Sequence, residues 1–337
     1  MLEKVLIKDS ELVEFSKSNT LADRTRALVK HQIKYWDMAR DGYSSLDNVQ
    51  IRKFEFDDFS VSIQFNPGRI TSSSAKVDEK SINERPCFLC YKNLPENQRG
   101  IQYFRDYLIL VNPFPIFTEH LTIPKIDHIP QTIKYNFGGL LRLSEDIGKY
   151  YVVFYNGPKC GASAPDHMHF QAGLKDFMPI DSEYKSILDS KGELLYSGNG
   201  LAIYGIKDYL RYFFSIESAR IDMIKKAFAK FYSLLGEFDR SEEPMMNILS
   251  YYDKKAWRIL IFPRQMHRPS QFYESGEKNI LLSPAAVDLG GVCITPREKD
   301  FNNITKNQIV DIMRQVSITK ELFQYYSIKI SGFDFEE

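Results

Sequence analysis

The chain has 337 residues, of which 43% are hydrophobic and 14% aromatic, enough for about two packed units. Its 44 basic and 44 acidic side chains cancel. This zero balance argues against DNA or RNA as the main partner, because proteins that bind polyanions usually carry a basic excess. A small phosphorylated ligand remains compatible, since it needs only a few local cations.

The N-terminus and the cysteines bear on the cellular setting. Residues 1–15 carry acidic side chains early and contain no long apolar run, so we expect neither a signal peptide nor a membrane anchor. Cys87 and Cys90 form a C-x-x-C pair, whereas Cys160 and Cys293 are isolated. The sequence therefore predicts a reducing, cytoplasmic setting, in which C-x-x-C indicates metal or redox chemistry more often than a structural bridge.

Hydrophobic periodicity in the first half predicts one helix, several strands and a second helix. Apolar residues recur first at helical spacing and later alternate with polar ones, as they do in strands. A polar loop rich in serine and charge is expected at 68–86. The predicted elements are a helix over about 10–45, strands over 49–67, 107–117 and 120–125, a helix ending near 149, and strands over 150–157 and 167–173.

The second half repeats this mixture of strands and helices, and no low-complexity tract or long linker separates the two halves. The predicted elements are strands near 193–198 and 201–206, an amphipathic helix over 215–238, strands over 245–252, 257–264 and 292–296, and a last helix over 305–326.

A similarity between two segments of the chain suggests a duplicated α+β unit. Residues 122–130 (TIPKIDHIP) and 261–269 (IFPRQMHRP) share an apolar residue, proline, a cation, histidine and a second proline at equal spacing. Each segment follows a strand-forming run.

Residues 165–171 read PDHMHFQ and place two of the six histidines two positions apart. In a β-strand, His167, His169 and Gln171 would project to one face, and Met168 and Phe170 would face a core. A row of imidazole, imidazole and amide on one face indicates a metal or a substrate.

A zinc site is one reading of the first half, because zinc favours four tetrahedral cysteine and histidine ligands. The alternative is that the two paired cysteines are small, inert buried residues. The candidate ligands are Cys87, Cys90, His120, His128, His167 and His169.

Covalent catalysis by histidine is the second reading. Neutral imidazole attacks phosphorus well, and a nucleotidyl-histidine divides one difficult displacement into two easier ones. In CGASAPDH, the small residues Gly161, Ala162 and Ser163 let backbone N–H groups and the serine hydroxyl approach a phosphate. Gln171 can donate a hydrogen bond without supplying a proton. For any single residue, the alternative is a satisfied structural group.

Three motifs together resemble one branch of the histidine-triad superfamily. They are CFLC at 87–90, the Asp127-His128 pair, and GAS-P-HMHFQ within 161–171. The combination resembles the galactose-1-phosphate uridylyltransferases, and also the diadenosine tetraphosphate phosphorylases and plant-type GDP-galactose phosphorylases. The resemblance implies an α+β fold of two fused histidine-triad-like units, with antiparallel sheets and packed helices. The units would be an N-terminal one over 1–175 with the catalytic row and a degenerate C-terminal one over 176–337.

The resemblance also implies roles for individual residues. His169 would take the nucleoside monophosphate, Gln171 would hold its phosphate and Ser163 would contact a phosphate. Arg69, Asn156 and Gly161 would contact the substrate. The structural Zn²⁺ ligands would be Cys87, Cys90, His128 and His167.

Some features depart from the uridylyltransferase pattern. Asp166 is an additional residue before His167, the preceding glycine loop is one residue shorter, and the spacing from Cys90 to His128 is also shorter. These departures disfavour galactose 1-phosphate as the substrate. His120 is expected to be structural, and His267 lies in a basic cluster that either meets a phosphate or forms a solvated patch.

The sequence thus predicts a nucleotidyltransferase that exchanges a nucleoside monophosphate between a nucleotide sugar, or dinucleoside polyphosphate, and a sugar 1-phosphate or phosphate. One alternative is a phosphorylase or hydrolase of dinucleoside polyphosphates or nucleotide sugars. Another is a non-catalytic, zinc-stabilised nucleotide-binding protein. The expected partners are a small nucleotide and a sugar phosphate, without nucleic acid or membrane, and fused relatives suggest a homodimer.

Overall fold

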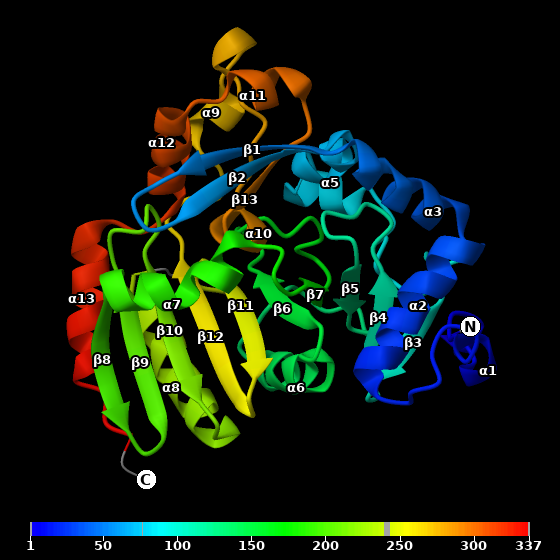
Figure 1. The fold of residues 1–337 in the computed structure, drawn as a ribbon, viewed down its shortest axis with the longest axis horizontal. Coiled ribbons are helices and arrows are strands. Elements are labelled where there is room, and N and C mark those ends of the chain that lie inside the picture. The colour runs from blue at the N-terminus through cyan, green and yellow to red at the C-terminus, as the bar shows by residue number, and fades with distance from the viewer. Residues whose placement is uncertain (1, 76, 239–242, 336–337) are drawn as a thin grey trace.

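A ten-stranded sheet forms the centre of the computed structural model, which describes residues 2–75, 77–238 and 243–335. Every strand pair in this sheet is antiparallel, and a smaller three-stranded sheet lies above it (Figure 1). In spatial order the large sheet contains β3 (Gly100–Tyr103), β4 (Tyr107–Val111), β5 (His120–Pro124), β7 (His169–Leu174), β6 (Tyr151–Asn156), β11 (Met246–Asp253), β12 (Ala256–Pro263), β10 (Phe213–Ser218), β9 (Leu201–Ile206) and β8 (Gly192–Gly198).

The strand order reveals two units of the same topology. In each unit three strands form a meander, a helix follows, and the fifth strand inserts between the third and the fourth. The intervening helices are α6 (Phe137–Ile147) and α8 (Ile221–Gly236), and the two fourth strands, β6 and β11, pair at the centre of the sheet. The predicted α+β fold with two fused units is therefore confirmed.

The two similar segments that suggested the duplication, 122–130 and 261–269, are nevertheless not structurally equivalent. Residues 122–130 continue from the third strand of the first unit, β5, whereas residues 261–269 continue from the fifth strand of the second unit, β12. The two segments occupy different places in the repeated topology, so their similarity does not reflect the duplication.

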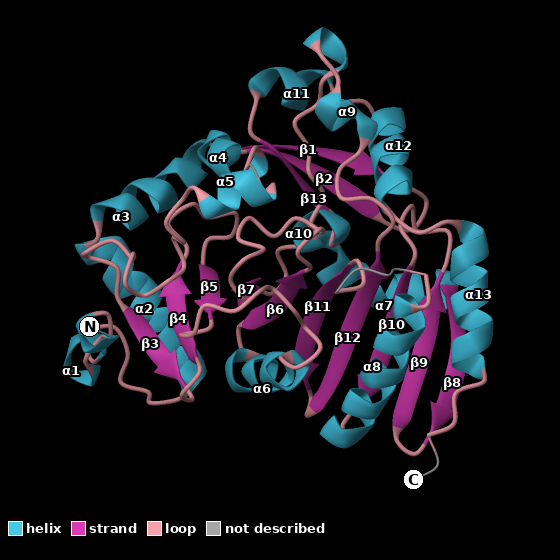
Figure 2. Cartoon of the chain, turned by 180° about the vertical axis from the view of Figure 1, so that it is seen from behind, coloured by secondary structure: helices cyan, strands magenta, loops and turns pink. Residues whose placement is uncertain are grey.

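Helices cover one face of the large sheet. They are α2 (Leu21–Tyr35), α6, α8 and α13 (Lys320–Ser331), and apolar side chains such as Phe170, Ile248 and Ile259 pack beneath them. Seen from behind, α8 lies in front of the strands (Figure 2), whereas α7 (Pro179–Lys191) lies in front of them in Figure 1. The two helices therefore cover opposite faces.

The small sheet covers the other face. It consists of β1 (Gln50–Glu55), β2 (Ser60–Phe65) and β13 (Val292–Thr295), and the parallel pairing of β2 with β13 connects the first half of the chain to the second. A second apolar core, including Val61, Phe154 and Leu260, lies between the sheets. Because both faces of the large sheet are covered, all six residues of β6 are buried, which explains why the strand is an apolar and aromatic run up to its last residue, Asn156.

Shorter helices complete the fold. They are η1 (Leu2–Lys4), α1 (Asp9–Leu12), α3 (Asp37–Ser44), η2 (Ser45–Asn48), η3 (Pro67–Arg69), α4 (Ile70–Ser73), α5 (Glu79–Asn83), α9 (Ser270–Tyr273), η4 (Gly276–Lys278), α10 (Ala286–Leu289), α11 (Glu298–Asn303) and α12 (Lys306–Val316).

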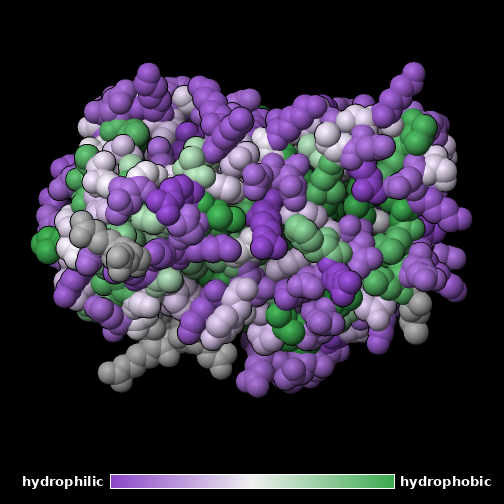
Figure 3. Space-filling model, turned by 90° about the horizontal axis from the view of Figure 1, so that it is seen from below, coloured by the Kyte–Doolittle hydropathy of each residue, from purple (hydrophilic) through white to green (hydrophobic). Residues whose placement is uncertain are grey.

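None of the helices within the described ranges has the length and apolar character needed to cross a lipid bilayer. The face seen in Figure 3 mixes hydrophilic and apolar side chains without one continuous apolar surface.

Two long predicted helices are broken. The helix expected over 10–45 is interrupted before Thr20, which caps α2, and again at Trp36, whose backbone is extended. The helix expected over 305–326 is two helices, because residues 317–319 are not helical and Thr319 caps α13 by accepting a hydrogen bond from the Leu322 N–H. A side-chain N-cap begins a new helix, and so divides a segment in which the apolar periodicity continues.

Other element boundaries also differ. The helix expected from residue 215 begins at Ile221, because 213–218 form β10. The polar loop at 68–86 contains the short helices α4 and α5. The short strand β3 and the helix α7 were not predicted.

Candidate functional site

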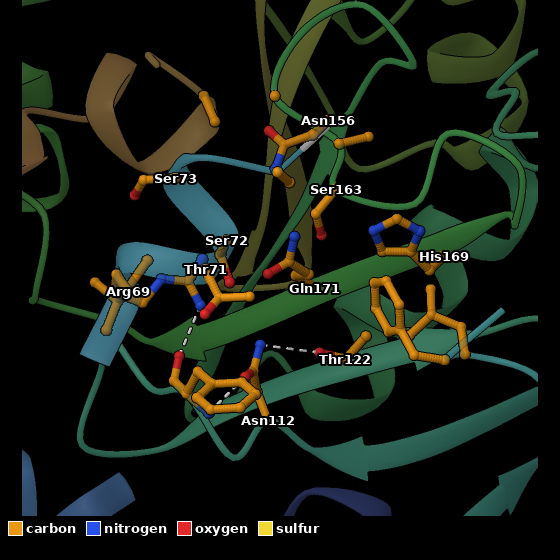
Figure 4. Close-up of a pocket in the computed structure, with 18 of the residues that line it drawn as sticks. Arg69, Thr71, Ser72, Ser73, Asn112, Thr122, Asn156, Ser163, His169 and Gln171 are labelled. Carbon is orange, nitrogen blue, oxygen red and sulfur yellow. Dashed lines mark hydrogen bonds between the residues drawn. The ribbon is translucent and has the colours of Figure 1, made fainter. Parts of the chain in front are cut away.

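A cavity of about 660 Å³ lies on the face of the large sheet that is covered by the small sheet. Every predicted catalytic and substrate-binding residue lines it, although these residues come from distant parts of the first half. His169 and Gln171 lie on β7, and Asn156 ends β6 (Figure 4). The others are Ser163, Gly161 and Arg69.

The predicted row of three side chains is divided. β7 begins at His169, and His167 precedes it in a bend, so only His169 and Gln171 project from the strand into the cavity. Met168 and Phe170 pack in the opposite core, as expected. The expectation that His167 shares the strand face is therefore wrong, and its ring lies in the cysteine cluster described below.

The ring of His169 is held in one tautomer. Its Nδ1 lies 2.8 Å from the backbone oxygen of His167. Because a carbonyl can only accept, Nδ1 carries the hydrogen and Nε2 keeps its lone pair. Burial lowers the pKa of His169 to about 4. His169 is only 3% exposed as a residue, yet it forms part of the cavity wall, so a neutral imidazole nitrogen is available to a molecule within the cavity.

Gln131 fixes the backbone that carries this ring. Its Oε1 accepts from the His169 N–H at 2.8 Å, and its Nε2 donates to the backbone oxygens of His169 and Asn156 at 3.1 and 2.9 Å. Sequence reasoning missed this residue, because a single glutamine in a loop carries no pattern.

The amide of Gln171 is also oriented. The Ile116 N–H donates to His120 Nδ1 at 3.3 Å, so the other ring nitrogen, Nε2, carries the hydrogen and donates to Gln171 Oε1 at 3.1 Å. The NH₂ group of Gln171 then remains for the cavity. Burial, and next the charge of Arg69, lower the pKa of His120 to about 3, which keeps its ring neutral.

The loop around Ser163 lies against the second half of the chain. Gly161 has φ of +93°, and a Cβ at this position would lie 2.5 Å from the Cβ of Ala285. Only glycine meets both requirements, which explains its place in the sequence. The close approach brings the Ser163 side chain to the cavity.

Arg69 supplies positive charge to the cavity. It ends η3, just after β2, and its Nη1 donates to the backbone oxygen of Phe114 at 2.7 Å. Within the described ranges, no carboxylate lies within ion-pair distance of its guanidinium. Burial lowers the pKa of Arg69 to about 10, so the group still carries its charge at neutral pH. Thr71, Ser72 and Ser73 follow it along the same wall (Figure 4).

The four predicted zinc ligands come together beside the cavity. The ligand atoms of Cys87, Cys90, His128 and His167 all lie within 4.8 Å of one another. The Sγ of Cys90 is 3.1 Å from His128 Nδ1, and the Sγ of Cys87 is 3.3 Å from His167 Nδ1. All four cysteines are free thiols.

The donor set suits a tetrahedral metal ion. Two thiols and two imidazoles are a common zinc ligand set. His167 Nε2 donates to the Lys125 backbone oxygen at 2.8 Å, which turns the lone pair of Nδ1 toward the sulfur atoms. Such outer hydrogen bonds usually fix metal-binding histidines. The cluster can therefore hold a metal ion.

Asp166, the additional residue before His167, connects this cluster to the cavity. Its Oδ1 accepts from Arg85 Nη2 at 2.9 Å, and its Oδ2 lies 3.8 Å from His128 Nε2. Arg85 lines the cavity and lies over the Phe88 ring at 5.0 Å. One carboxylate thus lies between a candidate metal ligand and a cationic cavity residue.

The second half also contributes to the cavity. His267 and Arg268, from the predicted basic cluster, line it together with Ser283 and Asp288. Arg264 is only 5% exposed, so the alternative of a solvated patch is wrong for this member of the cluster. The motif at 264–268 was the signal for His267 and Arg268, but the sequence could not show that they share a cavity with His169.

Two family models match the chain. Residues 28–174 match a domain of unknown function, DUF4922, and residues 187–333 match the GDPGP1-like C-terminal domain. Among curated proteins, none matches the chain.

Solved structures of yeast Ap4A phosphorylase Apa2 are similar in fold. One has a TM-score of 0.54 at 16% identity and covers 86% of this chain and 97% of that one. The complex with Ap4A gives 0.55 at 16% identity, with 83% and 96% covered, and the complex with AMP gives 0.52 at 17% identity, with 85% and 96% covered. The expected resemblance is therefore confirmed at the level of fold: the chain shares the two-unit fold of yeast Ap4A phosphorylase Apa2, and its second half matches the GDPGP1-like C-terminal domain.

Proposed function

We propose that this protein is a nucleotidyltransferase that works through a covalent nucleotidyl intermediate on His169. Its substrate would be a nucleotide sugar or a dinucleoside polyphosphate. The acceptor would be inorganic phosphate or a sugar 1-phosphate. The observation that carries the proposal is the orientation of the His169 ring, whose Nδ1 is bound to the His167 carbonyl while the ring lines the cavity.

In the first step, Nε2 of His169 attacks the α-phosphorus of the nucleotide. The Nε2–P bond forms, the bond from phosphorus to the bridging oxygen breaks, and the phosphorylated leaving group departs with the electron pair. The Nδ1–H bond to the His167 carbonyl stabilises the positive charge that develops on the ring. In the second step, an oxygen of the acceptor phosphate attacks the same phosphorus and the N–P bond breaks.

Donors around the cavity suit the phosphate charge in both steps. The NH₂ group of Gln171, the Ser163 hydroxyl and the Arg69 guanidinium lie on walls of the same cavity. Oriented donors of this kind stabilise charge where it develops. None of these three groups is a general base at neutral pH, so none can take a proton from an attacking water, whereas an anionic phosphate oxygen needs no deprotonation; this favours transfer to a phosphate over hydrolysis.

The Cys₂His₂ cluster would hold a structural Zn²⁺ ion. The ion would fix the turn that carries Cys87 and the bend that carries His167, and so the carbonyl that orients His169. Its four protein ligands would leave no open position for a substrate. We further propose that 1–175 and 176–337 act as two units that share one cavity, and that the protein works in the cytoplasm.

Intact-mass measurement tests the proposal. Purified protein is incubated with a panel of nucleotide sugars and dinucleoside polyphosphates, each with and without inorganic phosphate. A mass increase of one nucleoside monophosphate on the wild type, absent from His169→Ala and lost on adding phosphate, is the expected result. An adduct that persists on His169→Ala would refute the nucleophile.

The same panel separates the alternatives. Loss of the adduct in water alone, at the same rate as with phosphate, would indicate a hydrolase. Nucleotide binding without any adduct, together with bound zinc, would indicate a non-catalytic binding protein.

A further inference from the structure

Arg264, at the end of β12, is a buried cation whose contacts are all acceptors. Its Nη1 donates to Asn247 Oδ1 at 2.6 Å and to the Pro284 backbone oxygen at 2.9 Å, and its Nε donates to the Val316 backbone oxygen at 2.9 Å. A guanidinium has no acceptor. The atom of Asn247 that faces it must therefore be the carbonyl oxygen, which fixes the orientation of that amide.

The orientation of Asn247 determines that of Asn156 across the central strand pair. Asn247 is fully buried, and its Nδ2 donates to Asn156 Oδ1 at 2.8 Å and to the Cys160 backbone oxygen at 2.7 Å. Both amide hydrogens are thereby used. The Ala286 N–H also donates to Asn156 Oδ1, at 2.9 Å. Two donors from the second half thus hold the Asn156 oxygen away from the cavity.

The NH₂ group of Asn156 is left for the cavity, which this residue lines. Asn156 ends β6, the strand that pairs with β7, so it lies near Gln171 and Ser163 around the same space (Figure 4). A rotation of its amide by 180° would turn an oxygen toward the site and lose both accepted hydrogen bonds. The second half therefore selects a donor at this position.

We infer that Asn247 and Arg264 are positioning residues for nucleotidyl transfer, which fix Asn156 so that its NH₂ group donates to the phosphate bound at His169. This inference rests on the proposed function. It gives the C-terminal unit, expected to be degenerate, a part in the chemistry. We expect the fixed NH₂ group to stabilise the transition state more than the bound substrate, because a preorganised donor acts mainly on the charge that develops during the reaction.

The test compares single-turnover rates of adduct formation. Asn247→Asp keeps the size of the side chain and its contact with Arg264, but it cannot donate to Asn156. We expect the rate to fall about 100- to 1000-fold, the range seen when one oxyanion donor is lost, while the nucleotide dissociation constant changes less than about threefold. Asn156→Ala, which removes the donor itself, should give a similar loss.

The double variant separates positioning from a general structural role. If Asn247 acts through Asn156, Asn247→Asp should slow the Asn156→Ala protein no further. Asn136→Asp serves as a matched control, because Asn136 is a buried asparagine outside the cavity whose Oδ1 accepts from Tyr107 and whose Nδ2 donates to the Thr132 backbone oxygen. This control should keep the wild-type rate at temperatures where it is folded.

The possible outcomes are distinguishable. A wild-type rate for Asn247→Asp, or losses that multiply in the double variant, would overturn this inference and leave the proposed function intact. If Asn247→Asp does not fold, Asn247→Ser, which still donates one hydrogen bond, takes its place, with an expected loss between those of wild type and Asn156→Ala. A wild-type protein without any adduct would overturn the proposed function and this inference with it.

Discussion

The Nδ1 atom of His169 lies 2.8 Å from the backbone oxygen of His167, whose own ring faces Cys87 and Cys90. One residue therefore belongs to the candidate metal cluster through its side chain and to the candidate active site through its carbonyl. We therefore expect a change in the cluster to alter the position of the His169 ring through this hydrogen bond, so the cluster can be tested through both metal content and chemistry.

We expect the purified protein to contain roughly one zinc ion per chain. Cys87→Ser should lose this metal, because a hydroxyl is a poor zinc ligand, and should form the His169 adduct more slowly because the His167 bend is no longer held. Inductively coupled plasma mass spectrometry measures the metal directly. Cys293→Ser, which changes a buried thiol outside the cluster, should retain it. Full zinc content in Cys87→Ser would contradict the assignment.

Asp166→Asn should weaken metal binding about tenfold or more, the usual effect of removing a carboxylate beside a metal-binding histidine. The carboxylate lies 3.8 Å from His128 Nε2 and also binds Arg85. Competition with a chromophoric chelator gives the affinity. Asp127→Asn is the matched control, because Asp127 is an exposed neighbour of His128. Equal losses in both variants would indicate a general charge effect.

The pH dependence of stability should report the buried His120 ring. Burial and the Arg69 charge lower its pKa to about 3, whereas an unfolded histidine titrates near about 6.5. The unfolded chain therefore binds a proton that the native chain does not. The stability contributed by this neutral ring is complete above about pH 6.5 and declines toward pH 3, by up to about 1.4 kcal/mol per pH unit.

His120→Phe removes this titration. Urea unfolding at pH 7, 6 and 5 gives the free energy of unfolding at each pH. We expect it to fall less steeply with decreasing pH in the variant, because up to about one proton fewer is taken up on unfolding. The slope is the readout because the substitution also lowers stability at every pH, by removing the acceptor of the Ile116 N–H. Identical slopes would show that His120 is protonated in the native state.

Gly161→Ala should destabilise the fold by about 2 to 4 kcal/mol, since it combines a left-handed backbone with steric overlap. The added methyl would lie 2.5 Å from the Cβ of Ala285. Gly276→Ala isolates the backbone contribution, because Gly276 also has a positive φ of +61° but a Cβ added there would meet no atom within 4 Å. We expect it to cost about 1 kcal/mol. Equal losses in denaturant unfolding would exclude the overlap with Ala285.

Much of the site could be predicted because its residues form short local patterns. The C-x-x-C turn and the histidines around residue 168 carry their chemistry in their spacing, and the four candidate metal ligands and the cavity residues come together as those patterns suggested. Strand alternation failed only at His167, because the strand begins two residues later.

The remaining features depend on contacts between distant segments. Asn247 is 91 residues from Asn156, and Arg264 is a further 17 residues along the chain from Asn247. Arg264 belongs to the basic cluster at 264–268, but neither that pattern nor the residues around Asn247 indicate that the two side chains meet. The helix breaks at Trp36 and Thr319 depend on backbone geometry and capping, which apolar periodicity does not encode.

The pairing of β6 with β11 has a consequence for the origin of the fold. Each is the fourth strand of its unit, so the central seam joins two equivalent edges in antiparallel register. A single ancestral unit would have exposed that edge to water and could have covered it by pairing with a second copy about a two-fold axis. Gene fusion would then have made an existing symmetric assembly permanent and left the second copy free to diverge in sequence, while its side chains came to line the cavity of the first.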